Sequence, residues 1–180
     1  RGGHSGNILE PLLRHSFVCP STVMMRRSIF EAIGGFDNEF RDAEDWDLWR
    51  RLAYAGVKFL SLKKVLVRTR LHRTSLSGFH NQVRMKEMNL LSFNNLFKKM
   101  TKSERLRYGA DQILGTLKLK LAVAHLLLGQ GKEFRFWLKD SRKWYWFLLW
   151  PLSVLPAGFI SGLIRRVWQY KQNLLFRRDG

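Results

Sequence analysis

The sequence predicts an α/β fold over residues 1–77, followed by an α-helical and strongly basic extension over residues 78–180. Short apolar runs and short helical patterns alternate in the first part, whereas long helical patterns fill the second. Residues 1–60 hold eight basic and eight acidic residues, and residues 61–180 hold 24 basic and six acidic residues. A hydrophobic content of 46% with 13% aromatic residues argues for a packed core and against a disordered chain.

The elements of the first part are expected to be short. Residues 16–26 are rich in apolar side chains and read as an extended segment leading into a strand, although Pro20 interrupts it. A helix over residues 29–33 follows, and Ser28 and Glu31 have the spacing of a capping box at its start. Two glycines then end this helix.

A second helix is predicted over residues 46–55, and Gly56 ends it. Its apolar face consists of residues at helical spacing, namely Trp46, Trp49, Leu52 and Ala53. Two strands are expected after it, at residues 57–60 and 65–71, the second with alternating side chains.

Long helices are predicted in the extension, over residues 79–100, 103–129 and 131–141. Residues 144–164 form an uncharged run of 21 residues, which is long enough to cross a bilayer. Two prolines inside the run and the aromatic cluster at its start favour a segment that lies in or dips into the membrane surface, with a single span as the alternative.

The chain opens at Arg1 without a Met or a signal-peptide pattern, which predicts a fragment of a longer protein. A single cysteine, Cys19, excludes an internal disulfide and fits a reducing compartment. The five histidines, at positions 4, 15, 72, 80 and 125, show no zinc-binding spacing. Any metal site is therefore expected to use carboxylates or residues outside this chain.

The chemically informative stretch joins a two-glycine turn at residues 34–35 to acidic residues at the start of the second helix, Asp42, Glu44 and Asp45. Backbone N–H groups at a helix N-terminus orient carboxylates, and the helix dipole favours their ionised form. An ionised aspartate can accept a proton. From spacing alone, helix capping worth about 0.3–1 kcal/mol per residue is the commoner explanation.

Several motifs occur together in one order: STVMMRR at 21–27, IGGFD at 33–37, EDWDLWRRLA at 44–53, GVKF at 56–59, and RLH at 70–72 with Ser75 and Ser77. In this arrangement residues 17–77 resemble the second half of the catalytic domain of family 2 glycosyltransferases. These enzymes invert the anomeric configuration and have the GT-A fold, a Rossmann-like nucleotide-diphospho-sugar transferase fold. The resemblance implies that residues 1–77 form the C-terminal half of such a domain.

Under this resemblance Asp45 corresponds to the catalytic base, which takes the proton from an acceptor hydroxyl. Glu44 beside it would orient the acceptor or the base. Gly34 and Gly35 would form the glycine loop next to the donor sugar, where a missing side chain lets the substrate approach the backbone. Trp46 could stack on a sugar face, but its helical spacing with Trp49 makes a place in the core the first expectation.

The resemblance also implies a divalent cation, Mg or Mn, on the nucleotide diphosphate. His72 corresponds to a histidine that helps bind this cation in many relatives; a histidine at a strand end is the alternative. Arg70 could pair with phosphate oxygens, or it could be a solvated strand residue. The D-x-D pattern at residues 45–47 is not assigned to the metal, because the family's D-x-D lies upstream in the nucleotide-binding half. That half and the principal metal ligands are absent here, so the isolated fragment is expected to be inactive.

The implied partners are a nucleotide-sugar donor and a glycan or lipid-linked acceptor, as in surface polysaccharide or glycolipid synthesis. Residues 79–180 mix basic residues with tryptophan, phenylalanine and leucine, which favours contact with an anionic membrane surface. The expected location is cytoplasmic, at the inner face of the membrane. The alternative is a basic membrane- or nucleic-acid-binding module without catalysis, but no nucleic-acid-binding motif is present and no nucleic acid is expected as a partner.

Overall fold

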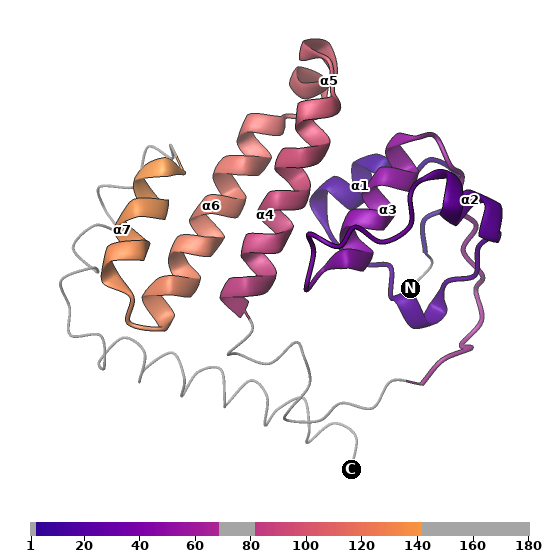
Figure 1. The fold of residues 1–180 in the computed structure, drawn as a ribbon, viewed down its shortest axis with the longest axis horizontal. Helices are drawn as coiled ribbons and strands as arrows, with labels where there is room; N and C mark the ends of the chain where they lie inside the picture. Colours follow the sequence, from indigo (N-terminus) through magenta and orange to yellow (C-terminus); the bar gives the residue numbers. More distant parts are fainter. Residues whose placement is uncertain (1–2, 69–81, 142–180) are drawn as a thin grey trace. The chain divides into compact units, whose positions relative to one another are not determined.

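The computed structural model describes residues 3–68 and 82–141 (Figure 1). Within these ranges the chain forms α1 (Leu9–Arg14), the 3-10 helix η1 (Pro20–Thr22), α2 (Arg27–Ala32), α3 (Glu44–Tyr54), α4 (Gln82–Lys99), α5 (Lys102–Arg107), α6 (Ala110–Leu127) and α7 (Gly131–Asp140). The chain divides into two compact units, Arg1–Leu114 and Gly115–Gly180. The predicted domain boundary at residue 77 lies outside the described residues.

The core of the first unit forms around α3, which packs against α1 and α4 (Figure 1). Helical spacing places the apolar residues of α3 on one side, and Leu48, Trp49, Leu52 and Ala53 are all buried. Three helices thus share one apolar centre. The residues that α1 and α4 bury are Leu9, Leu12, Leu13, Leu90, Phe93, Leu96 and Phe97.

The second predicted helix is confirmed, and it begins two residues earlier than expected. Glu44 and Asp45 belong to its first turn. Its end is as expected, because Gly56 has a φ of +83° and its N–H donates to Ala53 O at 3.2 Å. The next amide, Val57 N–H, donates to Leu52 O at 3.0 Å and closes the helix end.

The predicted α/β fold, and with it a Rossmann-like GT-A half-domain, is wrong for the described residues, which contain helices but no strand and no sheet. The segment at 16–26 contains the 3-10 helix η1. Residues 57–60 form only an isolated antiparallel bridge between Gly6 and Phe59. Residues 65–68 lie in no strand, and residues 69–71 fall outside the described part.

The physical reason lies in the missing partners of these segments. A strand is stabilised by backbone hydrogen bonds to neighbouring strands and by one buried face, and a lone extended segment has neither. Leu60, Val65 and Leu66 are 82%, 91% and 70% exposed. Alternating apolar residues therefore do not show whether a neighbouring strand will pair with a segment, and the predicted strands are wrong for the described residues.

The predicted capping box at Ser28 and Glu31 is also wrong. α2 begins at Arg27 with no side-chain cap, and Glu31 instead forms an ion pair with Arg27, Oε1 to Nε at 2.7 Å. A capping box does form at α5, where Thr101 and Glu104 satisfy each other's backbone N–H groups.

The long helices predicted in the extension are present, with one division. α4 and α7 fall within the predicted ranges, whereas Gly109, at a φ of +64°, separates α5 from α6 where one helix was expected. In the second unit α6 and α7 bury Ala122, Leu126, Phe134 and Leu138 together. Lys118 Nζ and Asp140 Oδ2 form an ion pair at 2.8 Å.

The uncharged run at 144–164 and residues 79–81 lie outside the described residues. Among the helices that are described, none combines the length and the apolar character needed to cross a membrane.

Candidate active site at the start of α3

The chain enters α3 through an unusual backbone conformation. Ala43, the residue before the helix, has a φ of +62° and is buried. Left-handed backbone is uncommon outside glycine and must be held in place by its surroundings. Ala43 O accepts a hydrogen bond from Asp47 N–H at 3.2 Å, and the preceding Asp42 forms an ion pair with Arg84 of α4. The first turn of α3 is thereby fixed on both sides of Ala43.

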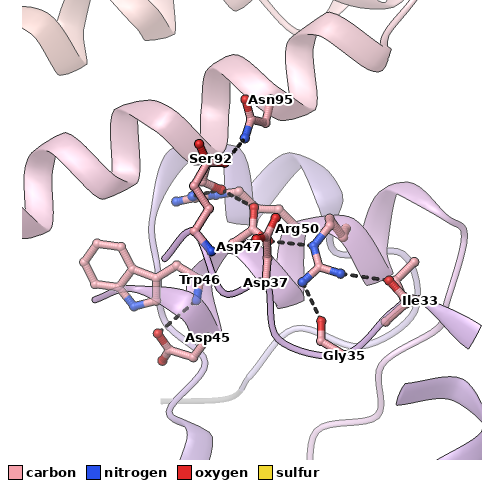
Figure 2. Close-up of polar contacts among 11 residues, drawn as sticks. Ile33, Gly35, Asp37, Asp45, Trp46, Asp47, Arg50, Ser92 and Asn95 are labelled. Atoms are coloured by element: carbon pink, nitrogen blue, oxygen red, sulfur yellow. Dashed lines mark hydrogen bonds and ion pairs between the residues drawn. The ribbon is translucent and has the colours of Figure 1, made fainter. Parts of the chain in front are cut away.

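Asp45 is half-buried in this first turn, and its Oδ1 accepts a hydrogen bond from Trp46 N–H at 2.9 Å (Figure 2). Burial raises the pKa of Asp45 above its ordinary value, and the charge of Glu44 adds to the increase. The Trp46 amide and the Arg50 charge lower the pKa, but by less than burial raises it. Burial therefore outweighs the hydrogen bonds that favour the ionised form of Asp45. Once ionised, a carboxylate with a raised pKa is a better proton acceptor.

The other predicted residues of this turn have different surroundings. Glu44 and Trp46 are half-buried, so both retain some contact with solvent. Trp49 is only 3% exposed and belongs to the core, as its spacing predicted. Its indole N–H has no hydrogen-bond partner within the described part of the chain.

The predicted glycine loop is a tight turn after α2. Gly34 and Gly35 have φ values of +85° and +64°, which side-chain-bearing residues rarely adopt. Their amides donate to Glu31 O at 3.0 Å and to Phe30 O at 2.9 Å, so the turn continues from the end of α2. A Cβ atom at position 35 would lie 3.1 Å from Phe30 Cζ, so a side chain there would press on the Phe30 ring in addition to straining the backbone.

Arg51 joins this turn to α3, a contact that the sequence analysis did not anticipate. Its Nη1 donates to Ile33 O at 2.9 Å and its Nη2 to Gly35 O at 2.7 Å. Its Nε donates to Asp47 Oδ2 at 2.6 Å. The i,i+4 spacing of Asp47 and Arg51 was a signal for this ion pair. No pattern in the sequence indicates the two carbonyl partners.

Arg50, the neighbouring residue, points into the core and is 2% exposed. Its guanidinium carbon lies 4.0 Å from the centre of the Phe93 ring. Burial lowers the pKa of Arg50 to about 10, so the group remains protonated at neutral pH. Its guanidinium donates to neutral oxygens, those of Ser92 at 3.1 Å, Asn89 at 2.6 Å and Ser16 at 3.3 Å.

The two remaining predicted site residues, Arg70 and His72, lie outside the described residues. Among the residues that are described, no three metal-binding side chains gather at one place. Glu44 and Asp45 alone do not fit a complete site for a divalent cation.

A family model described as "Glycosyltransferase like family 2" matches residues 7–110. The matched region includes the glycine turn, all of α3 and all of α4. No curated protein and no solved structure matches the chain.

Proposed function

This chain belongs to the glycosyltransferase-like family 2, and from that premise we propose that it transfers a sugar from a nucleotide-diphosphate donor to a hydroxyl acceptor with inversion. Asp45 acts as the general base. The observation that carries this proposal is a half-buried carboxylate with a raised pKa, in the first turn of a helix that the family match covers.

The proposed reaction is a single displacement at the anomeric carbon. The acceptor oxygen attacks this carbon while its proton passes to the Asp45 carboxylate. The bond from the anomeric carbon to the diphosphate oxygen breaks, and the nucleoside diphosphate leaves with that electron pair. Asp45 Oδ1 is held by the Trp46 amide, which leaves Oδ2 to receive the hydroxyl proton.

The remaining predicted residues bind substrates in this proposal. Gly34 and Gly35 lie beside the donor sugar, Trp46 packs against a sugar face and Glu44 orients the acceptor. Arg70 pairs with the diphosphate, and His72 helps to hold a Mg or Mn ion. That cation, when bound, would neutralise charge on the leaving diphosphate.

The test uses full-length protein with a panel of nucleotide-sugars and Mg or Mn salts. Release of nucleoside diphosphate and the anomeric configuration of the product are measured. Asp45→Asn should lower turnover by about 10²–10⁴-fold. Asp111→Asn is the matched control, because Asp111 is also in the first turn of a helix but is 92% exposed. A product with retained configuration, or an active Asp45→Asn variant, would sink the proposal.

We also propose that the protein works in the cytoplasm at the inner face of a membrane, on a lipid-linked or surface-glycan acceptor. Its net charge of +18 supports attraction to anionic lipids. Helix α7 supports it as well, because Lys132, Phe136 and Lys139 are exposed at i, i+4 and i+7 spacing. An aromatic side chain between two lysines suits a headgroup layer.

A further inference from the structure

We propose that Arg51 is a positioning residue that fixes the Gly34–Gly35 turn against α3, and that Ser92 of α4 positions Arg51 through Asp47. The hydrogen bonds of Arg51 and Ser92 are present in the structure whatever reaction the protein catalyses. Their importance for catalysis rests on the proposed function, in which the turn lies beside the donor sugar.

The Arg51 side chain holds the turn through its three guanidinium nitrogens. Its three nitrogens make three separate contacts, to Ile33 O, Gly35 O and Asp47 Oδ2, all between 2.6 and 2.9 Å. The two carbonyls flank Gly34, so both ends of the turn are held by one planar group. A lysine has one nitrogen on a flexible stem and cannot reproduce this fork.

Asp47 is in turn anchored to α4. Its side chain is 5% exposed; Oδ2 pairs with Arg51 and Oδ1 accepts from Ser92 Oγ at 2.9 Å. Ser92 is 1% exposed, and its oxygen accepts from Arg50 Nη1 at 3.1 Å. A hydroxyl has one proton, so Ser92 donates to the carboxylate and accepts from the guanidinium. A continuous series of polar contacts thus runs from α4 through α3 to the turn (Figure 2).

Apart from Arg51, the turn is supported mainly by α2, which is short and exposed. The amides of Gly34 and Gly35 bond back to the end of α2. That helix has six residues and buries none of them, and the contact of its Phe30 ring with Phe36, 5.4 Å between ring centres, joins the turn to α2 and not to the core. Asp45 and Asp47 lie two residues apart in α3, and the Arg51 contacts therefore place the turn and the proposed base in one frame.

The experiment measures amide hydrogen exchange by NMR on full-length protein. Arg51→Lys should accelerate exchange at Gly34 and Gly35 at least about tenfold, the equivalent of about 1.4 kcal/mol. The buried amides of α3 should keep their protection. Arg27→Lys is the matched control, because Arg27 also makes an i,i+4 ion pair, with Glu31 on α2, but is 90% exposed. Ser92→Ala, a small change far from the turn, should accelerate the same two amides about threefold and serves if Arg51→Lys does not fold.

Turnover supplies the second readout. Because the turn lies beside the donor in the proposed function, Arg51→Lys should raise the KM for the nucleotide-sugar about tenfold and change kcat by less than about threefold. Accelerated exchange at Gly34 and Gly35 in a protein that transfers no sugar would support the structural link and reject the proposed function. Unchanged exchange at these amides, or an equal increase along all of α3, would overturn the inference. An unchanged KM in an active enzyme would overturn its catalytic part.

Discussion

Burial raises the pKa of Asp45 above the value of an exposed aspartate, and this shift has a consequence for stability. Folding favours the protonated form of such a group, because the folded pKa lies above the unfolded one. The favourable contribution is present below the unfolded pKa and is lost as pH rises through the folded pKa. At neutral pH the ionised Asp45 therefore opposes folding.

Asp45→Asn tests this sign. An asparagine keeps an oxygen that can accept from the Trp46 amide but carries no charge to desolvate. We expect the Tm at neutral pH to stay equal or to rise, with the difference from wild type shrinking as pH falls below the folded pKa. Thermal unfolding across this pH range is the measurement. A variant that is clearly less stable at neutral pH would mean that Asp45 serves mainly as a helix cap.

The same raised pKa sets the pH profile of the proposed transfer. Asp45 must be ionised to accept a proton, so kcat/KM should fall as pH drops through its pKa. Because this pKa is raised, the fall should begin at a higher pH than for an exposed aspartate. The profile of full-length protein checks this, and an acid limb at the ordinary value of aspartate would contradict it.

The glycine turn offers a comparison between two adjacent positions. Gly35→Ala meets both a φ of +64° and the Phe30 ring 3.1 Å away, whereas Gly34→Ala meets a φ of +85° and open space. We expect Gly34→Ala to cost about 1–2 kcal/mol of unfolding free energy and Gly35→Ala to cost more. Urea denaturation measures both. Gly6→Ala, with a φ of +86° and no neighbour within 4 Å, is the control for backbone strain alone.

The sequence could indicate these site residues only in part. The glycine pair and the Glu44–Asp45 pair stand in recognisable motifs, because their chemistry depends on residue types a few positions apart. The Arg51 contacts to Ile33 and Gly35 join positions 18 and 16 residues apart through backbone carbonyls, which carry no residue-specific pattern. Ala43 adopts a left-handed backbone that its residue type does not predict.

At the scale of helices, α3 is held by apolar packing and by polar contacts. Its apolar residues pack against α1 and α4, and its polar residues contact the glycine turn and Ser92 of α4. Arg50 is an exception, since it carries a charge into the core over Phe93 without a carboxylate pair among the described residues. Its direct hydrogen-bond partners are neutral oxygens, and the charges of Asp47 and Asp45 favour its protonated form less than burial opposes it. Such a buried charge stabilises little relative to an apolar side chain of its size.

Arg50→Met should therefore be tolerated better than Arg50→Ala. Both substitutions remove the desolvated charge and leave the oxygens of Ser92 and Asn89 without the Arg50 donor. Methionine still fills the space against Phe93, whereas alanine also leaves a cavity. We expect the unfolding free energies of the two variants to differ by about 2 kcal/mol or more. Urea denaturation checks this, and equal destabilisation would show that the hydrogen bonds of Arg50 outweigh its packing.

Helices are easier to predict from this sequence than strands, because a helix forms its hydrogen bonds within one segment. A helix closes its hydrogen bonds within one segment, so periodic apolar residues in α3, α4 and α7 were enough to locate it. A strand needs a second segment, and no periodicity within residues 57–60 or 65–68 shows whether one is near. The break at Gly109 was missed because a single glycine is compatible with a continuous helix.

At the scale of the whole molecule, charge is the dominant property. The net charge is +18, and it derives from residues 61–180. Positive charge attracts anionic surfaces of any kind, so the net charge does not by itself distinguish binding to a bilayer from binding to a nucleic acid. The distinction comes from exposed apolar groups among the basic residues, which gain free energy in a headgroup layer and gain none from phosphate contacts.

Helix α7 allows the membrane proposal to be tested with one side chain. Phe136 is 62% exposed and lies between Lys132 and Lys139 on one face. In flotation with phosphatidylglycerol vesicles, full-length protein should bind, and raised salt should weaken binding because it screens the lysine charges. Phe136→Ser should lower the bound fraction at every salt concentration.

Met24→Ser is the control variant, because it alters a 98% exposed apolar residue in the charge-balanced part of the chain, residues 1–60. It should leave the bound fraction unchanged. Equal binding by Phe136→Ser, or salt-dependent binding to DNA without binding to vesicles, would contradict the membrane proposal, because a purely electrostatic surface does not need the phenylalanine.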